Sequence, residues 1–219
     1  MNQVFEIRGC DIIPVRVRLE KRYRVHSCAV RDDRIWVCGS RDDPFSCESY
    51  DEDFNMKDEG YTLFPHSYAA MVHNQRGLTL LGGISPKEGR NNKVEHYQNG
   101  AWTAGPSLPE RISSHSAHDV NGDIFVIGGS NADLGVMGQS PQVYMLGKDA
   151  EKWSTMPPLM RARSHHASVA LPNGGIFIVG DGFTFSPVQI YRNNQTETLS
   201  VKHGARAFPA AIHLSRPMC

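Results

Sequence analysis

No apolar run in the 219-residue sequence approaches the ~18 residues that a membrane-spanning helix requires. Residues 1–8 also lack the continuous apolar stretch that marks a secretory signal. Lys plus Arg and Asp plus Glu number 23 each, so the formal net charge is zero. This balance gives no electrostatic reason to expect nucleic acid or an anionic membrane as the main partner.

The cysteines give no sign of a metal or redox motif. The sequence holds five of them, and no two form a C-x-x-C pair. An odd number of cysteines without a secretory signal is typical of a reducing compartment. Free cysteines in apolar segments usually behave as inert core residues. We therefore expect free thiols in a cytoplasmic protein.

The main positive signal is an internal repeat. Four tyrosines follow one another at intervals of 47 residues: Tyr50, Tyr97, Tyr144 and Tyr191. Each repeat also has an apolar run that ends in a glycine, at Gly39, Gly82, Gly128 and Gly180. A fixed period of this length marks repeat architectures, whose stacked units bury one continuous core. The same structural unit is therefore expected four times.

Each unit has the pattern of short strands, and we find no ten-residue stretch with helical periodicity. We align the units on the histidines that begin them, at His26, His66, His115 and His165. A turn follows each first segment, and Asn-Gly at 121–122 is a strong hairpin signal because both positions must accept a positive φ. The apolar run, a variable polar loop, the tyrosine strand and, in two units, a tryptophan complete the pattern. Such even-spaced strands predict the blades of a β-propeller.

This pattern resembles the kelch repeat, which has a Gly-Gly doublet after four apolar residues and then a Tyr and a Trp. The third unit matches best, with residues 124–129, Tyr144 and Trp153. The first and fourth units depart from it, with Gly39-Ser40 and Gly180-Asp181 in place of the doublet. The resemblance covers about residues 22–214 and implies an all-β, kelch-type β-propeller.

Four recognisable blades are expected in one propeller domain or fragment, residues 1–219. Their approximate bounds are 22–64, 65–109, 110–159 and 160–203, with partial strands at 1–20 and 205–219. A propeller must close its ring, because end blades otherwise expose apolar faces and unpaired edges. Either the two partial segments complete a strained fifth blade, or the chain is part of a longer propeller. The second arrangement is the one we expect.

The chemistry-bearing residue types do not form a convincing catalytic or metal set. His115 and His118 are three residues apart, which places them on opposite faces of a strand, and His165-His166 offers no converging set of ligands. The serines that follow three of the repeat histidines lack a G-x-S-x-G elbow. We expect no catalytic residues, no bound metal and no cofactor.

The variable loops on one propeller face are the expected binding surface, because binding residues concentrate on loops that a rigid scaffold positions. Arginine, aromatic and methionine side chains dominate protein–protein hot spots. In the adaptor members of the kelch family, the resemblance implies, arginine and serine residues near the head of each unit line the partner pocket. The predicted partner-binding residues are Arg90, Asn91, Asn131, Asp133, Arg111, Arg161, Arg163, Ser164 and Phe183.

Two classes of function are open. The resemblance to BTB-kelch adaptors implies a non-enzymatic interaction module, which recognises substrates for a cullin-type ubiquitin ligase or binds actin. The helical BTB and BACK segments that precede the propeller in such adaptors have no counterpart in these 219 residues. The alternative is a sugar-active kelch enzyme, such as a mutarotase or a copper oxidase. The interaction module is the function that we expect.

Overall fold

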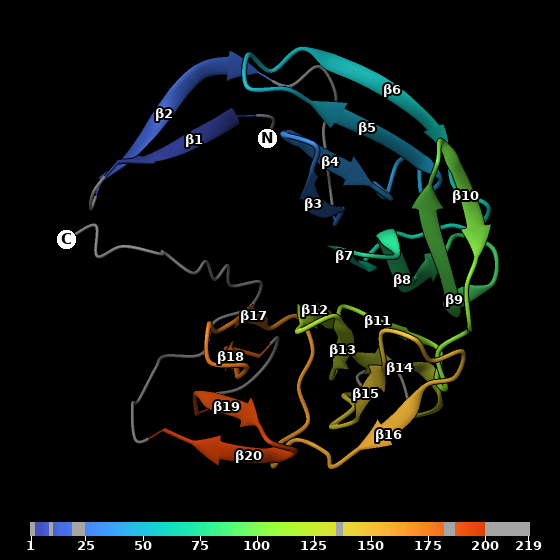
Figure 1. The fold of residues 1–219 in the computed structure, drawn as a ribbon, viewed down its shortest axis with the longest axis vertical. Coiled ribbons are helices and arrows are strands. Elements are labelled where there is room, and N and C mark those ends of the chain that lie inside the picture. Colours follow the sequence, from blue (N-terminus) through green and yellow to red (C-terminus); the bar gives the residue numbers. More distant parts are fainter. Residues whose placement is uncertain (1–2, 9–10, 19–24, 135–137, 182–186, 200–219) are drawn as a thin grey trace.

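Four antiparallel sheets of four strands each surround a common axis, as in a β-propeller (Figure 1). This computed structural model describes residues 3–8, 11–18, 25–134, 138–181 and 187–199. The first strand of each sheet lies toward the centre and the fourth lies on the outside (Figure 1). Within this described part the single helical segment is the short 3-10 turn η1 (Ala132–Leu134), and no helix is long and apolar enough to cross a membrane.

The strands follow one another through each blade in sequence order. The first blade contains β3 (Ser27–Arg31), β4 (Arg34–Cys38), β5 (Ser46–Tyr50) and β6 (Met56–Tyr61). The second contains β7 (Ala70–Asn74), β8 (Gly77–Ser85), β9 (Gly89–Gln98) and β10 (Ala101–Ala104). The third contains β12 (Ser116–Val120), β13 (Asp123–Ile127), β15 (Val143–Leu146) and β16 (Ser154–Met156). The fourth contains β17 (Ala167–Ala170), β18 (Ile176–Val179), β19 (Gln189–Arg192) and β20 (Gln195–Thr198).

Two smaller sheets accompany the blades. β11 (Ile112–Ser113) pairs with β14 (Ser130–Asn131), which ties the segment entering the third blade to a loop of that blade. Near the N-terminus, β1 (Gln3–Arg8) and β2 (Asp11–Arg18) form an antiparallel pair beside the first blade, in the region where partial strands were expected (Figure 1). The other expected partial segment, 205–219, lies outside the described residues.

The core lies between neighbouring blades rather than within any one of them. The ring of Trp36 in the first blade packs against that of Tyr97 in the second, tilted by 52° with centroids 4.9 Å apart, and the Tyr97 ring lies 5.1 Å from that of Trp102. Leu78 and Leu80, fully buried in the middle of β8, pack into the same cluster. Each large side chain that is fully buried in this way contributes roughly 1.5–3 kcal/mol. Aromatic rings thus fill the space between blades, as the repeat predicts.

The repeat tyrosine occupies the same strand position in the first, second and fourth blades, but a different position in the third. Tyr50, Tyr97 and Tyr191 pair with Ile35, Leu78 and Ile176, each four residues before the glycine that ends the run. The residue that pairs with Ile124, the corresponding position of the third blade, is Leu146. Tyr144 instead lies opposite Val126, two positions earlier along its strand, and its hydroxyl donates to the Glu110 carboxylate at 2.5 Å. The even spacing therefore hid a two-residue shift.

The glycine that ends each apolar run is required where the next blade begins. Gly39, Gly82 and Gly128 have φ of 73°, 60° and 59°, a left-handed conformation that residues with a Cβ adopt only at a cost. A Cβ at these positions would lie 2.3, 2.7 and 2.6 Å from the backbone oxygens of His66, Ile112 and Arg163 respectively. Those three residues occupy the same place in successive connections between blades. The glycine therefore allows the chain entering the next blade to lie against the strand end.

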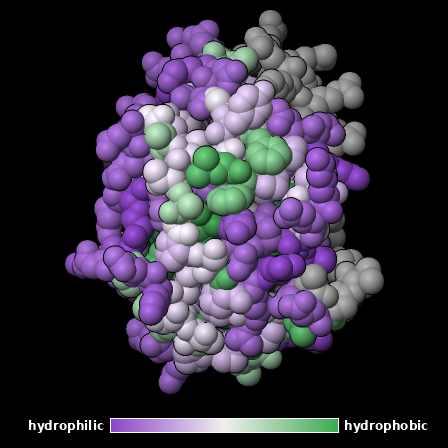
Figure 2. All heavy atoms as spheres, turned by 90° about the vertical axis from the view of Figure 1, so that its right-hand side faces the viewer, coloured by the Kyte–Doolittle hydropathy of each residue, from purple (hydrophilic) through white to green (hydrophobic). Residues whose placement is uncertain are grey.

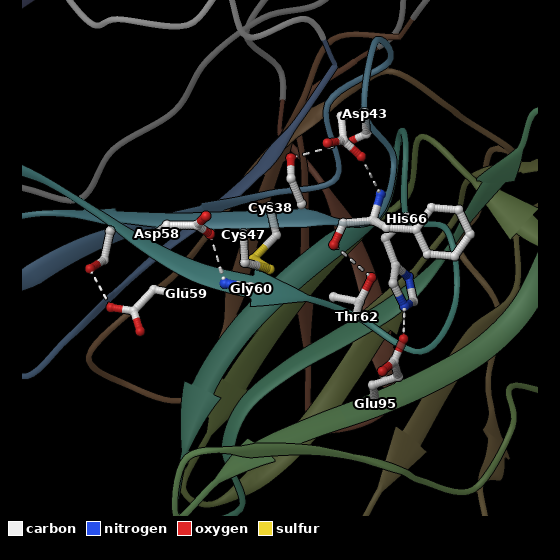
Figure 3. The surroundings of a disulfide bond; sticks show 12 residues. Cys38, Asp43, Cys47, Asp58, Glu59, Gly60, Thr62, His66 and Glu95 are labelled. Atoms are coloured by element: carbon white, nitrogen blue, oxygen red, sulfur yellow. Dashed lines mark hydrogen bonds and ion pairs between the residues drawn. A yellow bond between two sulfur atoms is a disulfide. The ribbon is translucent and has the colours of Figure 1, made fainter.

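A buried disulfide in the first blade corrects the expectation of free thiols. Cys38 and Cys47 face each other on β4 and β5 and are bonded, with their Cα atoms 4.2 Å apart (Figure 3). Both side chains are almost fully buried. Their spacing of nine residues shows no C-x-x-C motif, so the pairing depends on strand register, which the cysteine pattern alone does not give. Cys28 is the free cysteine among the described residues, and Cys10 and Cys219 lie outside them.

Loss of this disulfide is expected to lower the free energy of unfolding by about 2–3 kcal/mol, because a closed loop of about ten residues restricts the unfolded chain by that amount. The test compares urea unfolding of the oxidised and reduced protein. The double substitution Cys38→Leu with Cys47→Val serves as control, since Leu81 and Val94 face each other at the same position of the second blade. Reduction should leave the double variant unchanged. Equal stability of the oxidised and reduced protein would contradict the prediction.

Candidate functional site

The loops of the propeller divide between two ends of the blades. Turns between the first two strands and between the last two strands lie at one end. The opposite end is here named the loop face. It carries described segments after the second strands (39–45, 128–134, 138–142, 180–181 and 187–188 among them) and the connections between blades (62–69, 105–115 and 157–166). This topology places eight of the nine predicted partner-binding residues at the loop face, and the ninth, Phe183, lies outside the described residues.

Exposed apolar side chains concentrate at the loop face. Among the described residues seven large hydrophobic side chains are exposed, and five of them lie at this end: Phe45, Tyr61, Leu63, Leu134 and Met160. The other two, Val30 and Ile35, flank the turn between β3 and β4 at the opposite end. The flank of the propeller on the right of Figure 1 is mostly hydrophilic, with one small hydrophobic group (Figure 2). The exposed large hydrophobic side chains are thus distributed unevenly between the two ends of the blades.

A cavity of about 200 Å³ lies where the four blades begin, and it is named here the axial cavity. Each blade contributes the same two positions just before or at the start of its first strand. The lining residues are Val25 and His26, Tyr68 and Ala69, Ser114 and His115, and His165 and His166. The first residue of each pair has a φ between 53° and 57°, so the chain makes the same left-handed turn as it enters every blade.

Backbone hydrogen bonds link these turns around the cavity. The Tyr68 N–H donates to the Val25 carbonyl at 2.8 Å, and the Ser114 N–H donates to the Tyr68 carbonyl at 2.8 Å. The His165 N–H continues the chain to the Ser114 carbonyl at 2.9 Å. The main chain around the cavity is therefore fixed by its own bonds, and side chains determine what the cavity can bind.

Histidine and serine side chains connect the third and fourth blades. Nε2 of His165 lies 3.0 Å from Oγ of Ser114, and Nε2 of His166 lies 2.9 Å from Oγ of Ser116. Deeper along the same strands, Nε2 of His118 lies 2.6 Å from Oγ of Ser168. In each of these three contacts the imidazole faces a serine hydroxyl, which can donate or accept a hydrogen bond but carries no charge.

Burial keeps these imidazoles uncharged. Desolvation lowers the pKa of His115 and His166 to about 3 and that of His118 to about 4. Desolvation also lowers the pKa of His165, and the positive charge of Arg90 adds to that effect. Both ring nitrogens of His115 lack a hydrogen-bond partner within the described residues, although the Leu81 carbonyl favours its protonated form. The cavity is thus lined by neutral imidazoles.

Arg163 and Ser164 do not face a partner, which corrects the prediction for these two residues. Arg163 is 0% exposed, and its guanidinium donates to the carbonyls of Gly180 and Pro187 and, at 2.7 Å, to Oε1 of Gln189. Ser164 is buried too, and its hydroxyl contacts His165. Arg163 binds the connection to the fourth blade and has a structural role there. Burial lowers its pKa to about 10, and Asp181 opposes that shift.

The other predicted residues fall into two groups. Arg111, Arg161 and Asp133 are exposed at the loop face. Asn91 and Asn131 are buried and hold loops: the first donates to the Pro65 carbonyl, and the second donates to the Glu110 carboxylate. Burial and these bonds give the two asparagines a structural role, and partner contact by either of them stays a prediction.

Arg90 lies between blades at the loop face. Its Nε donates to Oγ of Ser113 at 3.2 Å, and its Nη2 donates to Oγ of Ser130 at 2.8 Å. It is half-buried and holds its guanidinium beside the residues that enter the third blade. Arg90 thus remains a candidate contact residue, together with Arg111, Arg161 and Asp133.

Sequence alignment on the histidines missed the axial cavity, because two of the four units were out of register. The structurally equivalent residues are His26, Ala69, His115 and His166. His66 therefore lies three residues before its structural equivalent Ala69, and His165 lies one residue before His166. The recurring left-handed residue would have set the register, but residues as different as Val25 and Tyr68 occupy it. Within the described residues no group of three or more His, Cys, Asp or Glu side chains converges as metal ligands.

Comparison with known proteins bears on fold and family. The chain is 32% identical over 137 residues to multiple epidermal growth factor-like domains protein 8 of Mus musculus, covering 55% of this chain and 5% of that protein. It is 41% identical over 69 residues to the kelch domain-containing protein SSO1033 of Saccharolobus solfataricus, covering 32% and 9%. It is 30% identical over 130 residues to kelch-like protein 30 of Mus musculus, covering 54% and 22%. The matched segments thus span at most about a fifth of these relatives.

The solved structure of YjhT superposes with a TM-score of 0.72 at 14% identity, covering 83% of this chain and 66% of that one. At this identity the likeness concerns the fold alone. No protein-family model matches the chain. Two of these relatives are named for the kelch repeat, and the chain has the blades of a propeller. Both findings agree with the kelch-like pattern of glycine, tyrosine and tryptophan in the sequence.

Proposed function

Because the chain is a kelch-repeat β-propeller, a scaffold that presents loops at one end, we propose that it is a protein-interaction module whose loop face binds a protein partner. The observation that supports this most is the placement of exposed apolar side chains, five of seven at that face. Hot spots combine buried apolar anchors with arginine. Arg111 and Arg161 supply exposed guanidinium groups at the same face.

The finer role follows from the resemblance to BTB-kelch adaptors. We propose that the partner is a substrate of a cullin-type ubiquitin ligase, with actin filaments as the second candidate partner. Both partners place the chain in the cytoplasm, and the Cys38–Cys47 disulfide counts against that compartment, because disulfides are rare there. A propeller that holds a substrate needs a rigid frame with adaptable loops. The blades give the frame through clusters such as that of Trp36 and Trp102, and the loops differ in length between blades.

The test uses affinity capture with purified chain, followed by binding measurement with the partner it identifies. Leu134→Asp and Met160→Asp together should weaken that binding at least tenfold, since each introduces a charge into the contact, and a tenfold loss is about 1.4 kcal/mol. The matched control is Ile35→Asp, an exposed apolar position at the opposite end. Equal binding by the wild type and the loop-face variant, or equal loss in the control, would refute the proposal. Capture of actin supports the second finer role, and capture of another protein whose ubiquitination depends on this chain supports the first.

A further inference from the structure

We propose that Asn194 is the acceptor of an N-linked glycan, in a chain that folds in an oxidising compartment. Residues 194–196, Asn-Gln-Thr, have the Asn-X-Thr pattern to which such glycans are attached, here called the sequon. No other Asn-X-Ser or Asn-X-Thr occurs in the 219 residues. Because so short a pattern also arises by chance, its place in the fold and the redox state of the chain decide whether it is a site. The site is independent of the loop-face binding proposed above.

The sequon begins at the hairpin turn between β19 and β20. Asn193 and Asn194 form this two-residue turn, with φ of 50° and 59°, and both side chains are exposed. Two successive residues with positive φ make a tight turn whose tip projects beyond the paired strands. Within the described residues the Asn194 amide makes no hydrogen bond and no ion pair. It is therefore accessible to an enzyme and free to carry a bulky group.

The matching hairpin of the second blade has other residues at the two positions that define the sequon. In both hairpins the repeat tyrosine pairs with one residue of the last strand, which is Trp102 in the second blade and Thr196 in the fourth. The second residue of the turn is Gly100 in one hairpin and Asn194 in the other. The fourth blade thus departs from the second at both positions, and the two departures together create the sequon.

Turn geometry and packing give little reason for these departures. Gly100 has a φ of 82°, which glycine adopts freely and a residue with a Cβ adopts only at a cost. Trp102 is 9% exposed in the cluster between blades, and Thr196 brings no aromatic ring to replace it. The Thr196 hydroxyl does donate to the Pro158 carbonyl, but the distance of 3.4 Å is long for such a bond. Recognition as a glycan acceptor accounts for both Asn194 and Thr196.

The disulfide of the first blade is the second, independent observation. Cys38 and Cys47 are bonded, and disulfides form and persist in oxidising environments such as the lumen of the endoplasmic reticulum. A sequon on the surface of a protein that enters this lumen meets the enzymes that attach glycans to asparagine. The bonded cysteines and the exposed sequon lie in different blades, and both point to the same compartment.

The position of the turn is compatible with partner binding. Turns between the last two strands lie at the end of the blades opposite the loop face. β20 is also the outer strand of its blade (Figure 1). A glycan on Asn194 therefore extends into solvent away from the loops, and it leaves the loop face free to bind a protein.

The transfer requires a glycan activated as a polyprenyl pyrophosphate and a membrane-bound transferase. The side-chain nitrogen of Asn194 forms a bond to C1 of the first sugar, and the bond between that C1 and the pyrophosphate oxygen breaks. The polyprenyl pyrophosphate leaves with the electron pair, and one amide proton passes to a base of the transferase. Because the Thr196 hydroxyl bonds to the Pro158 carbonyl in the folded blade, transfer takes place before the fourth blade closes.

Mass spectrometry of the full protein, recovered from the cells that make it, tests the site. Trypsin cuts after Arg192 and after Lys202, and so releases the peptide 193–202. We expect this peptide to carry one glycan, and we expect peptide-N-glycosidase to remove the glycan and to leave an aspartate in place of Asn194. A peptide that carries no glycan overturns the proposal, whether or not Cys38 and Cys47 are bonded in the recovered protein.

Variants produced in the same cells separate the sequon from the turn. Asn194→Gly restores the turn residue of the second blade, so it should fold at least as well as the wild type and carry no glycan. Thr196→Val should also lose the glycan, whereas Thr196→Ser should retain it. Asn193→Asp changes the neighbouring turn residue, leaves the sequon intact and is the matched control. A glycan that persists in Asn194→Gly, or that is lost in Asn193→Asp, overturns the assignment.

The glycan and the loop-face binding fail separately. A chain without the glycan whose partner binding is weakened by Leu134→Asp with Met160→Asp removes only the present inference. A glycosylated chain whose binding is unchanged by that double variant removes only the proposed function. A glycosylated chain that binds through the loop face supports both, and it excludes actin and the substrate of a cytoplasmic ligase as the partner.

Discussion

At pH 5 the protein is expected to unfold at a far lower urea concentration than at pH 7, because three buried histidines are held neutral in the folded state. The pKa of His115 and His166 is lowered to about 3 and that of His118 to about 4. In the unfolded chain each returns to about 6.5, so the unfolded state binds protons first as the pH falls. Stability is complete above pH 6.5 and declines between there and the folded values. At pH 5 each histidine costs about 2 kcal/mol, and the three together about 6 kcal/mol.

Substitution of single histidines checks the origin of this loss. His118→Gln retains a side chain that can bond to the Ser168 hydroxyl but does not titrate. The free energy of unfolding of this variant should fall less steeply as the pH is lowered than that of the wild type. The difference in slope should correspond to about one fewer proton taken up on unfolding. His73→Gln, at an exposed position, is the control. An unchanged slope in His118→Gln would show that the acid sensitivity arises elsewhere.

The fold was predictable because its determinants recur along the sequence. Glycine at the end of each apolar run, as at Gly82 and Gly128, marks the place where the next connection approaches the strand end. Aromatic residues such as Trp102 mark the spaces between blades. Both requirements are local, and each blade repeats them with the same residue types. A pattern in one dimension was therefore sufficient to predict four blades.

The site was less predictable because its residues share a position without sharing a residue type. The same left-handed turn is made by four different residue types, at Val25, Tyr68, Ser114 and His165. The side chains therefore give no common sequence signal for the turn. Arg163 looked like a contact residue because loop arginines usually reach solvent. Its burial depends on Gln189, a residue 26 positions later that accepts its hydrogen bond. Long-range pairing of this kind is set by the assembled blade.

The same comparison of blades explains why an acidic residue is buried at Glu95. In the second, third and fourth blades, the third strand places a polar side chain at this position, where it binds the segment that enters the blade. Glu95 binds His66, Tyr144 binds Glu110 and Gln189 binds Arg163. Glu95 is fully buried, and its carboxylate accepts from the N–H groups of Leu63 and Phe64 at 2.8 Å. His66 contacts Glu95 at 2.8 Å (Figure 3). Its Nδ1 also lies 2.7 Å from the Gly82 carbonyl oxygen.

Glu95→Ala is therefore expected to lower the free energy of unfolding by about 3–5 kcal/mol, the usual cost of removing one member of a buried pair. The substitution leaves two backbone N–H groups and the His66 ring without their acceptor. Urea unfolding at pH 7 measures the change, and Glu88→Ala, an exposed carboxylate on the same blade, is the control. Glu95→Gln should cost less, because an amide oxygen still accepts and glutamine occupies the matching position of the fourth blade. A loss in Glu95→Ala no larger than in Glu88→Ala would mean that the carboxylate does not hold the connection between the first two blades.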